Sequence, residues 1–179
     1  MYVRHESRLF ERFDAFEFSL CERLNRSCRR NAVRDLFRTV SRLGDGVIWY
    51  VLALAIVAWN GAAGFKPALV MAGAGVLGWA LYKVLKSRLV RERPYITFER
   101  ILAGTAPLDR YSFPSGHTLH AVSFTWIAAS YYPVLGWVLI PFAMLVGASR
   151  VVLGLHYPSD VVVGAALGAS IAIGALQLA

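Results

Sequence analysis

The sequence predicts an all-α integral membrane protein, and three observations support this prediction. Hydrophobic residues make up 57% of the 179 residues and charged residues only 17%, a balance typical of membrane proteins. The charges gather in residues 4–45 and 83–110 instead of spreading along the chain. The remaining chain consists of apolar runs of helical length with few charges. We therefore expect an N-terminal amphipathic helical arm, residues 1–45, followed by a membrane-embedded helix bundle of about five transmembrane helices, residues 46–179.

The arm contains two segments in which apolar residues recur at helical spacing. One set is Leu9, Phe10, Phe13, Phe16 and Leu20, and the other is Val33, Leu36, Phe37 and Val40. Arginines fill many of the positions between them, so each segment predicts an amphipathic helix lying on the bilayer surface. A solvated arm or a helix packed against a partner would give the same pattern. The arm is too charged to span a membrane and lacks the apolar core of a cleavable signal peptide.

Five apolar segments follow the arm, separated by charged or turn-forming residues. They cover residues 46–60, 67–86, 115–132, 137–152 and 161–178. Pro67 is expected to start the second span, Pro133 and Gly136 to form a tight turn before the fourth, and Pro141 to kink the fourth. The polar stretch 87–113 predicts a long loop outside the membrane, and loops of that length are often functional.

The alternation of spans places several polar segments at one end of the bundle. With five spans, the end of the second, the start of the third, the end of the fourth and the start of the fifth share one membrane face. These ends carry Lys86 to Arg93, Ser115 to His117, Arg150, and His156 to Asp160. We therefore expect these residues to lie close together. A count of four or six spans would separate them.

The residue types at this predicted face suit the binding of a phosphate group. Lys86, Arg93 and Arg150 supply cations, and arginine can donate two parallel hydrogen bonds to phosphate oxygens. Ser115 and the Gly116 backbone N–H lie at a helix start, where free N–H groups and the helix dipole favour anions.

Three further residues at the same face could cleave a bound phosphate ester. His156 precedes Asp160 by four residues, so a carboxylate could orient a nucleophilic imidazole. His117 then remains to protonate the leaving oxygen. Each residue alone has a simpler explanation as a helix-end or interfacial charge. That simpler explanation is the expectation for five other cations and two loop carboxylates: Lys83, Arg88, Arg91, Arg100, Arg110, Glu92 and Asp109.

The three segments together resemble the type-2 phosphatidic acid phosphatase superfamily. The matching pattern is Lys86-x6-Arg93-Pro94, then Pro114-Ser115-Gly116-His117, then Ser149-Arg150-x5-His156-x3-Asp160. The resemblance implies a metal-independent phosphatase that works without a cofactor through a phosphohistidine intermediate. It implies His156 as nucleophile, Asp160 as its orienting partner and His117 as leaving-group acid. The phosphate-binding positions that it implies are Lys86, Arg93, Ser115, Gly116 and Arg150.

We therefore predict an enzyme that hydrolyses a phosphate monoester or pyrophosphate of a lipid, with the bilayer holding the tail. The predicted substrates, in order of preference, are an undecaprenyl-type pyrophosphate, phosphatidylglycerophosphate and phosphatidic acid. A lipid phosphotransferase, a vanadate-binding haloperoxidase and a non-enzymatic anion carrier or scaffold remain alternatives. No metal site is predicted, because no cluster of Asp, Glu, His or Cys has metal-ligand spacing, and Cys21 and Cys28 do not form a CxxC.

Partners and location follow from the distribution of charge and aromatic residues. Although the net charge is +8, the aromatic residues lie in apolar runs and not among the arginines, so a nucleic-acid partner is not expected. We expect a multi-pass protein of the cytoplasmic (inner) membrane. The resemblance favours an active site facing outward, toward the periplasm or cell exterior, whereas most Lys and Arg lie at the catalytic end, which the positive-inside rule places in the cytoplasm. The sequence does not indicate an oligomeric state.

Overall fold

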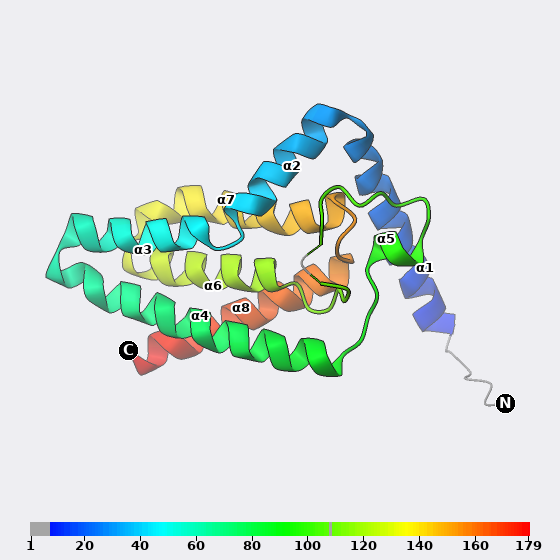
Figure 1. Ribbon diagram of the computed structural model, residues 1–179. Coiled ribbons are helices and arrows are strands. Elements are labelled where there is room, and N and C mark those ends of the chain that lie inside the picture. Colours follow the sequence, from blue (N-terminus) through cyan, green and yellow to red (C-terminus); the bar gives the residue numbers. More distant parts are fainter. Residues whose placement is uncertain (1–7, 108) are drawn as a thin grey trace.

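The computed structural model describes residues 8–107 and 109–179, and Figure 1 shows their arrangement. Apart from one β-bridge between Glu92 and Tyr111, the regular elements in these residues are all helices. The elements are α1 (Arg8–Asn25), the 3-10 helix η1 (Arg26–Arg29), α2 (Asn31–Leu43), α3 (Val47–Asn60), α4 (Ala62–Arg88), α5 (Pro94–Thr97), α6 (Gly116–Tyr131), α7 (Pro133–Val152) and α8 (Pro158–Leu178). The predicted all-α fold is confirmed.

The five apolar segments form a bundle in which α6 is the central helix. Helix α6 packs against α4, α7 and α8, and α3 packs against α4. Glycines in α8 allow its close approach to α6: a Cβ at Gly164 would lie 2.6 Å from the Ser115 carbonyl oxygen, and one at Gly168 would lie 2.3 Å from that of Leu119. Small residues four apart are a common means of close packing between membrane helices. This contact fixes the start of α8 beside the start of α6.

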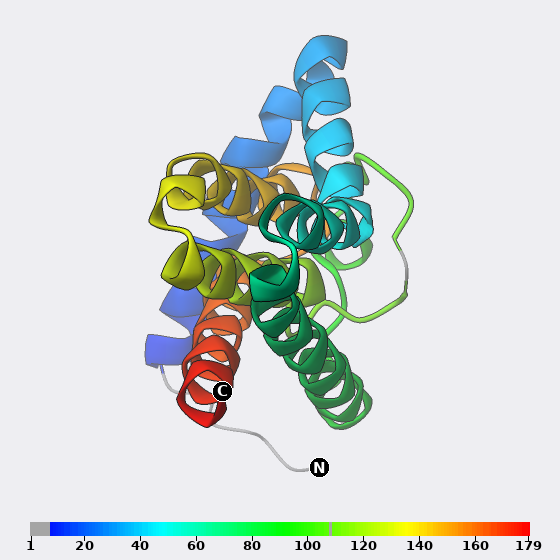
Figure 2. The same ribbon diagram turned by 90° about the vertical axis from the view of Figure 1, so that its left-hand side faces the viewer.

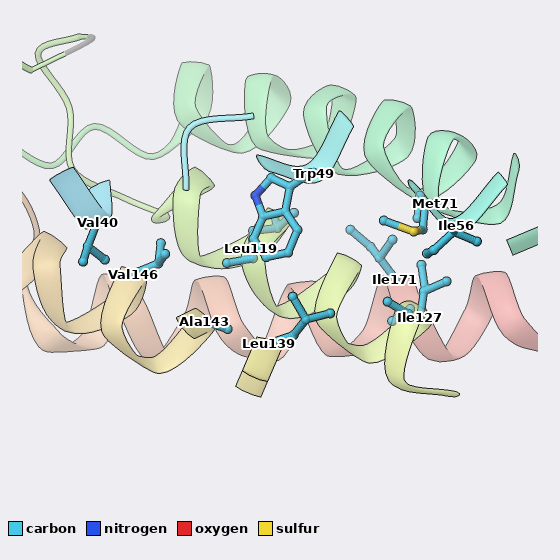
Figure 3. Packing of buried hydrophobic residues seen from close by; sticks show 14 residues of the cluster. Val40, Trp49, Ile56, Met71, Leu119, Ile127, Leu139, Ala143, Val146 and Ile171 are labelled. Carbon is cyan, nitrogen blue, oxygen red and sulfur yellow. The ribbon is translucent and has the colours of Figure 1, made fainter. Parts of the chain in front are cut away.

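The interior of the bundle is apolar, and so is much of its outer surface. Trp49, Leu119, Ile127 and Ile171 belong to the buried core, where they interdigitate between helices (Figure 3). Large apolar side chains also cover the outside. They include Leu54, Leu69, Val76, Trp137, Val138 and Val162, each at least 66% exposed. So much exposed apolar surface is rare in water and is expected for a protein surrounded by lipid.

The helices differ in how well their length suits a full membrane crossing. By length and hydropathy, α4, α7 and α8 qualify as spans among the described residues, and α2 with α3, bent by 52°, would form a fourth if it crosses as one. Helix α6 has 16 residues, about 24 Å at 1.5 Å per residue, and is shorter than a typical span. All five predicted segments are helical, and the count of five spans is approximate.

Two predicted boundaries differ from the structure. Helix α4 begins at Ala62, five residues before Pro67, because Gly61 makes the turn with a φ of 56° that favours glycine. Pro67 therefore lies inside the helix. Helix α7 begins at Pro133 itself, which takes the first helical position where a missing N–H costs nothing. The expected turn through Gly136 is absent, and Gly136 is part of α7.

The N-terminal arm packs on the end of the bundle where α6 and α8 begin (Figure 1). In Figure 1, α1 runs across this end of the bundle, and α2 leads from it to α3. In Figure 2, which views the bundle from its far end, α1 runs behind the bundle helices and α2 stands above them. Of the predicted apolar face, Phe13 and Phe16 are exposed, and Leu9 and Phe10 lie outside the described side chains. The fully buried residues of α1 are instead polar or small, namely Glu17, Cys21 and Asn25, and Phe18 packs beside them against Phe98.

Candidate phosphate-binding site

A cavity of about 700 Å³ opens between α3, α4 and α6, toward the end of the bundle where α6 begins. Its polar end contains six of the eight predicted site residues. They are Lys86, Arg93, Gly116, His117, Arg150 and His156. The other two do not line it: Ser115 and Asp160 are fully buried behind this wall. The structure thus brings together the helix ends that the topology argument placed on one face.

Three cations meet at the polar end from three different elements. Lys86 lies in the last turn of α4, Arg93 immediately precedes α5, and Arg150 lies in the last turn of α7. Arg93 is 2% exposed and donates to the Leu155 carbonyl oxygen at 2.8 Å. Arg150 is 3% exposed and donates to the Ser41 hydroxyl of α2, while its Nε has no hydrogen-bond partner among the described residues. Buried cations held this way are costly in the absence of an anion.

His156 lies in the short connection between α7 and α8. Its backbone N–H donates to the Arg150 carbonyl oxygen at 3.1 Å, and Gly154 makes the preceding turn with a φ of 72°. The ring faces the cations with Nε2, which lies 3.2 Å from a guanidinium nitrogen of Arg93. Burial, followed by the positive charges of Arg150 and Arg93, lowers the pKa of His156 well below its ordinary value. The imidazole is therefore neutral near pH 7 and retains a lone pair for attack.

Asp160 lies behind His156 in the first turn of α8. Its Oδ2 accepts the Tyr157 backbone N–H at 2.8 Å and lies 3.6 Å from His156 Nδ1. That distance exceeds a hydrogen bond, and Nδ1 has no other partner in the part of the chain that the structure describes. The pair therefore has the predicted orientation, with the carboxylate on the ring nitrogen opposite the cations, but the contact is not closed.

The start of α6 supplies the third segment. The Ser115 hydroxyl caps the helix: it accepts the Thr118 N–H at 3.5 Å and lies 2.9 Å from the Thr118 hydroxyl. Gly116 lines the cavity against the Tyr82 ring, where a Cβ would lie 2.9 Å from a ring carbon. His117 points its Nε2 at Asp45, in the turn between α2 and α3, at 3.1 Å. The hydrogen bond from His117 lowers the pKa of Asp45.

Two residues that the sequence treated as surface charges belong to this site. Asp109 lies 2.7 Å from Lys86 Nζ and 2.8 Å from an Arg93 nitrogen, and it also accepts from the Tyr82 hydroxyl. Arg91 lies 2.9 Å from Asp160. The expectation of interfacial or loop charges was wrong for both. No sequence pattern distinguished either residue, because each pairs with residues far away along the chain.

In the part of the chain that the structure describes, no group of three or more His, Cys, Asp or Glu side chains could hold a metal ion. Cys21 and Cys28 are both free and buried. Burial raises the pKa of the Cys21 thiol to about 12, with a further contribution from Glu17. The carboxylates beside the cavity are already paired. Asp109 pairs with Lys86 and Arg93, and Asp45 pairs with His117.

The helical bundle and its apolar outer surface define the class as an integral membrane protein, and its cation-lined cavity is a candidate anion site. Residues 48–179 match the model of the PAP2 superfamily, and the chain belongs to that family. The match covers the bundle, all three site segments included.

Curated relatives of this chain carry names of lipid phosphatases. The chain is 29% identical over 160 residues to the lipid A 1-phosphatase of Rhizobium etli, covering 78% of this chain and 68% of the relative. It is 36% identical over 141 residues to the decaprenylphosphoryl-5-phosphoribose phosphatase of Mycobacterium tuberculosis, covering 75% and 73%. The identity to phosphatidylglycerophosphatase B of Bacillus subtilis is 37% over 109 residues, covering 49% and 46%. These relatives support a membrane protein of the lipid phosphatase family.

Two solved structures share the fold. Aquifex aeolicus LpxE superposes with a TM-score of 0.79 at 24% identity, covering 99% of both chains. A PAP2-type phosphatidylglycerolphosphate phosphatase from Bacillus subtilis superposes with a TM-score of 0.74 at 22% identity, covering 97% of this chain and 87% of that one. Since the first match covers nearly the whole chain, the arm as well as the bundle belongs to the shared fold.

Proposed function

We propose that this protein is an integral membrane phosphatase that removes a terminal phosphate from a lipid phosphate or pyrophosphate through a phosphohistidine intermediate. The observation that supports it most directly is the shape and chemistry of the 700 Å³ cavity. Its lining includes three cations and three histidines, whereas the rest is largely apolar. Such a cavity suits a molecule with an anionic head and a hydrocarbon tail.

The cations at the polar end hold the phosphoryl oxygens. Phosphoryl transfer depends on neutralising charge on these oxygens and on placing the attacking and leaving atoms in line. Arg93 and Arg150 offer bidentate donors, Lys86 a point charge, and the Gly116 N–H a backbone donor at the start of α6. The buried Nε of Arg150, without a partner in the described chain, is a donor available for this purpose.

His156 is the nucleophile in this proposal. Its neutral Nε2 attacks phosphorus, the bond from phosphorus to the lipid oxygen breaks, and the phosphoryl group passes to the ring. Asp160 keeps the proton on Nδ1 and stabilises the positive charge that develops on the imidazole. The 3.6 Å separation between Asp160 Oδ2 and Nδ1 needs to shorten by less than 1 Å to form that hydrogen bond.

His117 completes the cycle by proton transfer. In the first step its protonated ring gives a proton to the departing lipid oxygen, and in the second the neutral ring takes one from the water that attacks the phosphohistidine. The products are the dephosphorylated lipid and inorganic phosphate. Asp45, 3.1 Å from Nε2 of His117, favours the protonated ring.

The apolar part of the cavity is the proposed place for the lipid tail. On α4 the lining follows one helical face: Ala68, Met71, Ala72, Gly75, Val76, Trp79, Tyr82 and Lys86. From Ala68 to Lys86 this face extends about 27 Å at 1.5 Å per residue, close to the ~30 Å thickness of a bilayer core. Trp49, Tyr50 and Ala53 of α3 face it across the cavity. A tail bound here remains at membrane depth while the headgroup reaches the cations.

Phosphate release from a panel of purified lipids in detergent tests the function. The panel contains undecaprenyl pyrophosphate, phosphatidylglycerophosphate, phosphatidic acid, lipid A and decaprenylphosphoryl-5-phosphoribose bearing its 5-phosphate. Lipid A was not expected from the sequence and enters because a relative's name includes it. We expect release from at least one lipid, and none from tailless glycerol phosphate. Loss of phosphate from the substrate only when a second lipid is present as acceptor would indicate a phosphotransferase. Oxidation of bromide in the presence of vanadate would indicate a haloperoxidase.

For the membrane face of the active site we propose the outward side, as the family resemblance implies. A cysteine placed at exposed Glu99, in the loop after α5, reports the face because Cys21 and Cys28 are buried and should label slowly. An impermeant maleimide added to intact cells should label Glu99→Cys. Labelling only after the cells are lysed would place the catalytic end in the cytoplasm.

A further inference from the structure

Glu17 on α1 is a buried carboxylate that joins the N-terminal arm to the start of α8. The residue is 1% exposed. Its Oε1 accepts the backbone N–H of Ser159 at 2.7 Å, and its Oε2 lies 2.6 Å from Arg91. Ser159 is the second residue of α8, where backbone N–H groups have no partner within the helix. A charge buried this deeply is costly unless fully paired, so α1 docks with Glu17 in one defined position.

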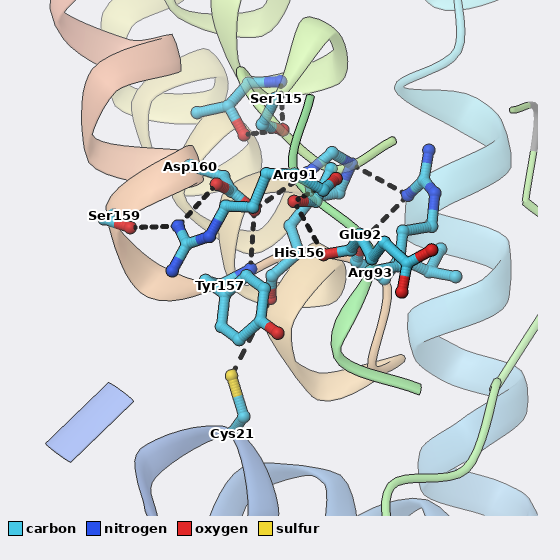
Figure 4. Close-up of polar contacts among 12 residues, drawn as sticks. Cys21, Arg91, Glu92, Arg93, Ser115, His156, Tyr157, Ser159 and Asp160 are labelled. Atoms are coloured by element: carbon cyan, nitrogen blue, oxygen red, sulfur yellow. Dashed lines mark hydrogen bonds and ion pairs between the residues drawn. The ribbon is translucent and has the colours of Figure 1, made fainter. Parts of the chain in front are cut away.

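Arg91 lies between Glu17 and the proposed catalytic carboxylate. One guanidinium nitrogen contacts Glu17 and the other donates to Asp160 Oδ1 at 2.9 Å and to the Ser159 hydroxyl at 2.7 Å. The guanidinium also lies over the Tyr157 ring, 3.8 Å from its centroid. Figure 4 shows Arg91 between Ser159 and Asp160, with Tyr157 against it. The planar group is therefore fixed by carboxylates on two sides and an aromatic face on a third.

These contacts leave one orientation for the Asp160 carboxylate. Oδ1 is held by Arg91, so Oδ2 faces the Tyr157 N–H at 2.8 Å and His156 Nδ1 at 3.6 Å. Asp160 has no exposure to solvent, so its carboxylate depends on these protein donors. Without the guanidinium, the carboxylate would rotate toward other donors, and His156 would lose the partner that orients its ring.

We propose that Arg91 and Glu17 are positioning residues for the nucleophile: Glu17 fixes Arg91, Arg91 fixes Asp160, and Asp160 orients His156. This inference rests on the proposed function of His156. On this proposal, α1 helps to position the active-site residues, although no described side chain of α1 lines the cavity. Neither residue touches the substrate, so their loss acts on kcat and leaves KM nearly unchanged.

Kinetics of Arg91 variants on the lipid that the wild-type enzyme hydrolyses best test this chain of contacts. Arg91→Ala is expected to lower kcat about 100-fold, the cost of displacing a reacting group by ~1 Å, and Arg91→Lys and Glu17→Gln to lower it less. The Arg91 side chain is 30% exposed, so the space left by Arg91→Ala is open to small cations. Millimolar guanidinium should restore part of the kcat of Arg91→Ala and none of that of His156→Ala.

The matched control is Arg110→Gln, which removes an arginine from an exposed pair with Glu92 on the same loop; it should behave as wild type. A kcat of Arg91→Ala equal to wild type, or a change confined to KM, overturns the positioning role while leaving the proposed function intact if His156→Ala is inactive. Loss of activity that guanidinium does not restore also overturns it. If Arg91→Ala does not fold, Arg91→Lys and Glu17→Gln decide: both must lose kcat at constant KM. An active His156→Ala overturns the proposed function itself.

Discussion

Asp109 Oδ2 lies 2.7 Å from Lys86 Nζ. Lys86 is one of the cations that we propose bind the substrate phosphate. The same carboxylate lies 2.8 Å from Arg93 through Oδ1. Burial opposes its ionisation, but hydrogen bonds from Lys86, Arg93 and Tyr82 prevail and lower the pKa of Asp109 to about 2. Asp109 is therefore charged at all working pH values, and an incoming phosphate must displace it from both cations.

Replacing Asp109 by Asn should strengthen binding of oxyanions. The neutral amide releases Lys86 and Arg93 more readily, and a charge-assisted hydrogen bond contributes ~1.5–3 kcal/mol, so we expect orthovanadate to inhibit Asp109→Asn at about tenfold lower concentration. Inhibition constants from steady-state assays measure this. Glu99→Gln, which changes an exposed carboxylate of the same loop, is the control. Weaker vanadate binding by Asp109→Asn would show that Asp109 organises the cations and does not compete for them.

The pH dependence of kcat/KM should reflect the lowered pKa of His156. Burial and the nearby arginines lower this pKa, so the ring stays neutral as the pH falls through the ordinary histidine pKa of about 6.5. We expect no loss of activity centred at that pH once the ionisation of the substrate, read by phosphorus NMR, is divided out. A corrected profile that falls with a midpoint near 6.5 would contradict a buried, neutral nucleophile.

The effect of replacing Asp45 on kcat should depend on the leaving group of the substrate. His117 lies 3.1 Å from Asp45, and removal of the carboxylate disfavours the protonated ring that the first step needs. Asp45→Asn should lower kcat by about tenfold for alkyl phosphates, a part of the 10²–10⁴-fold that general acid catalysis contributes. A nitrophenyl phosphate lipid, whose leaving group needs no proton, should be nearly unaffected. Equal losses on both substrates would remove Asp45 from proton transfer. The control is Asp35→Asn, which changes an exposed carboxylate on α2.

The apolar part of the cavity should discriminate substrates by tail length. Ala72 lines it on α4, whereas Ala80 is exposed on the same helix outside the lining. Ala72→Trp should raise KM for a long-chain lipid phosphate and leave KM for a short-chain analogue unchanged, because only the long tail reaches this depth. Ala80→Trp should change neither. A tail that bound elsewhere would leave Ala72→Trp like wild type on both substrates.

Chelation of divalent metals should not reduce activity. Lys86, Arg93 and Arg150 supply the positive charge that phosphatases of other kinds take from metal ions. We therefore expect equal rates before and after incubation with EDTA and passage through a desalting column. A loss that added Mg²⁺ or Zn²⁺ reverses would contradict this prediction.

The bundle could be predicted because membrane helices have a strong sequence signal. Apolar runs had to form helices to satisfy their backbone groups in lipid, and alternation of the spans brought Lys86, His117, Arg150 and His156 to one end. Helix boundaries were less secure. Pro67 looked like a start from its chemistry alone, but the turn is made at Gly61, and this depends on the close packing of α3 on α4.

The contacts between the site and its surroundings could not be predicted, because they join residues far apart in sequence without a local pattern. Glu17 pairs with Arg91 across 74 positions, and Asp109 turns back onto Arg93 from a loop without repeating structure. Nothing in the residues near Glu17 distinguishes it from the other acidic residues of an amphipathic helix. For Ser115, the sequence predicted the position at the start of α6 but not the contact. Its hydroxyl accepts the Thr118 N–H and caps α6.

The most direct test of the account is rapid acid-free quenching of the enzyme during turnover of a lipid labelled with ³²P in its terminal phosphate. Wild-type protein should carry label that is stable to base and lost in acid, as expected for phosphohistidine, and the label should map to His156. His156→Ala should still bind the lipid but take up no label and release no phosphate. Label on a different residue, or phosphate release by His156→Ala at the wild-type rate, would contradict the proposed mechanism.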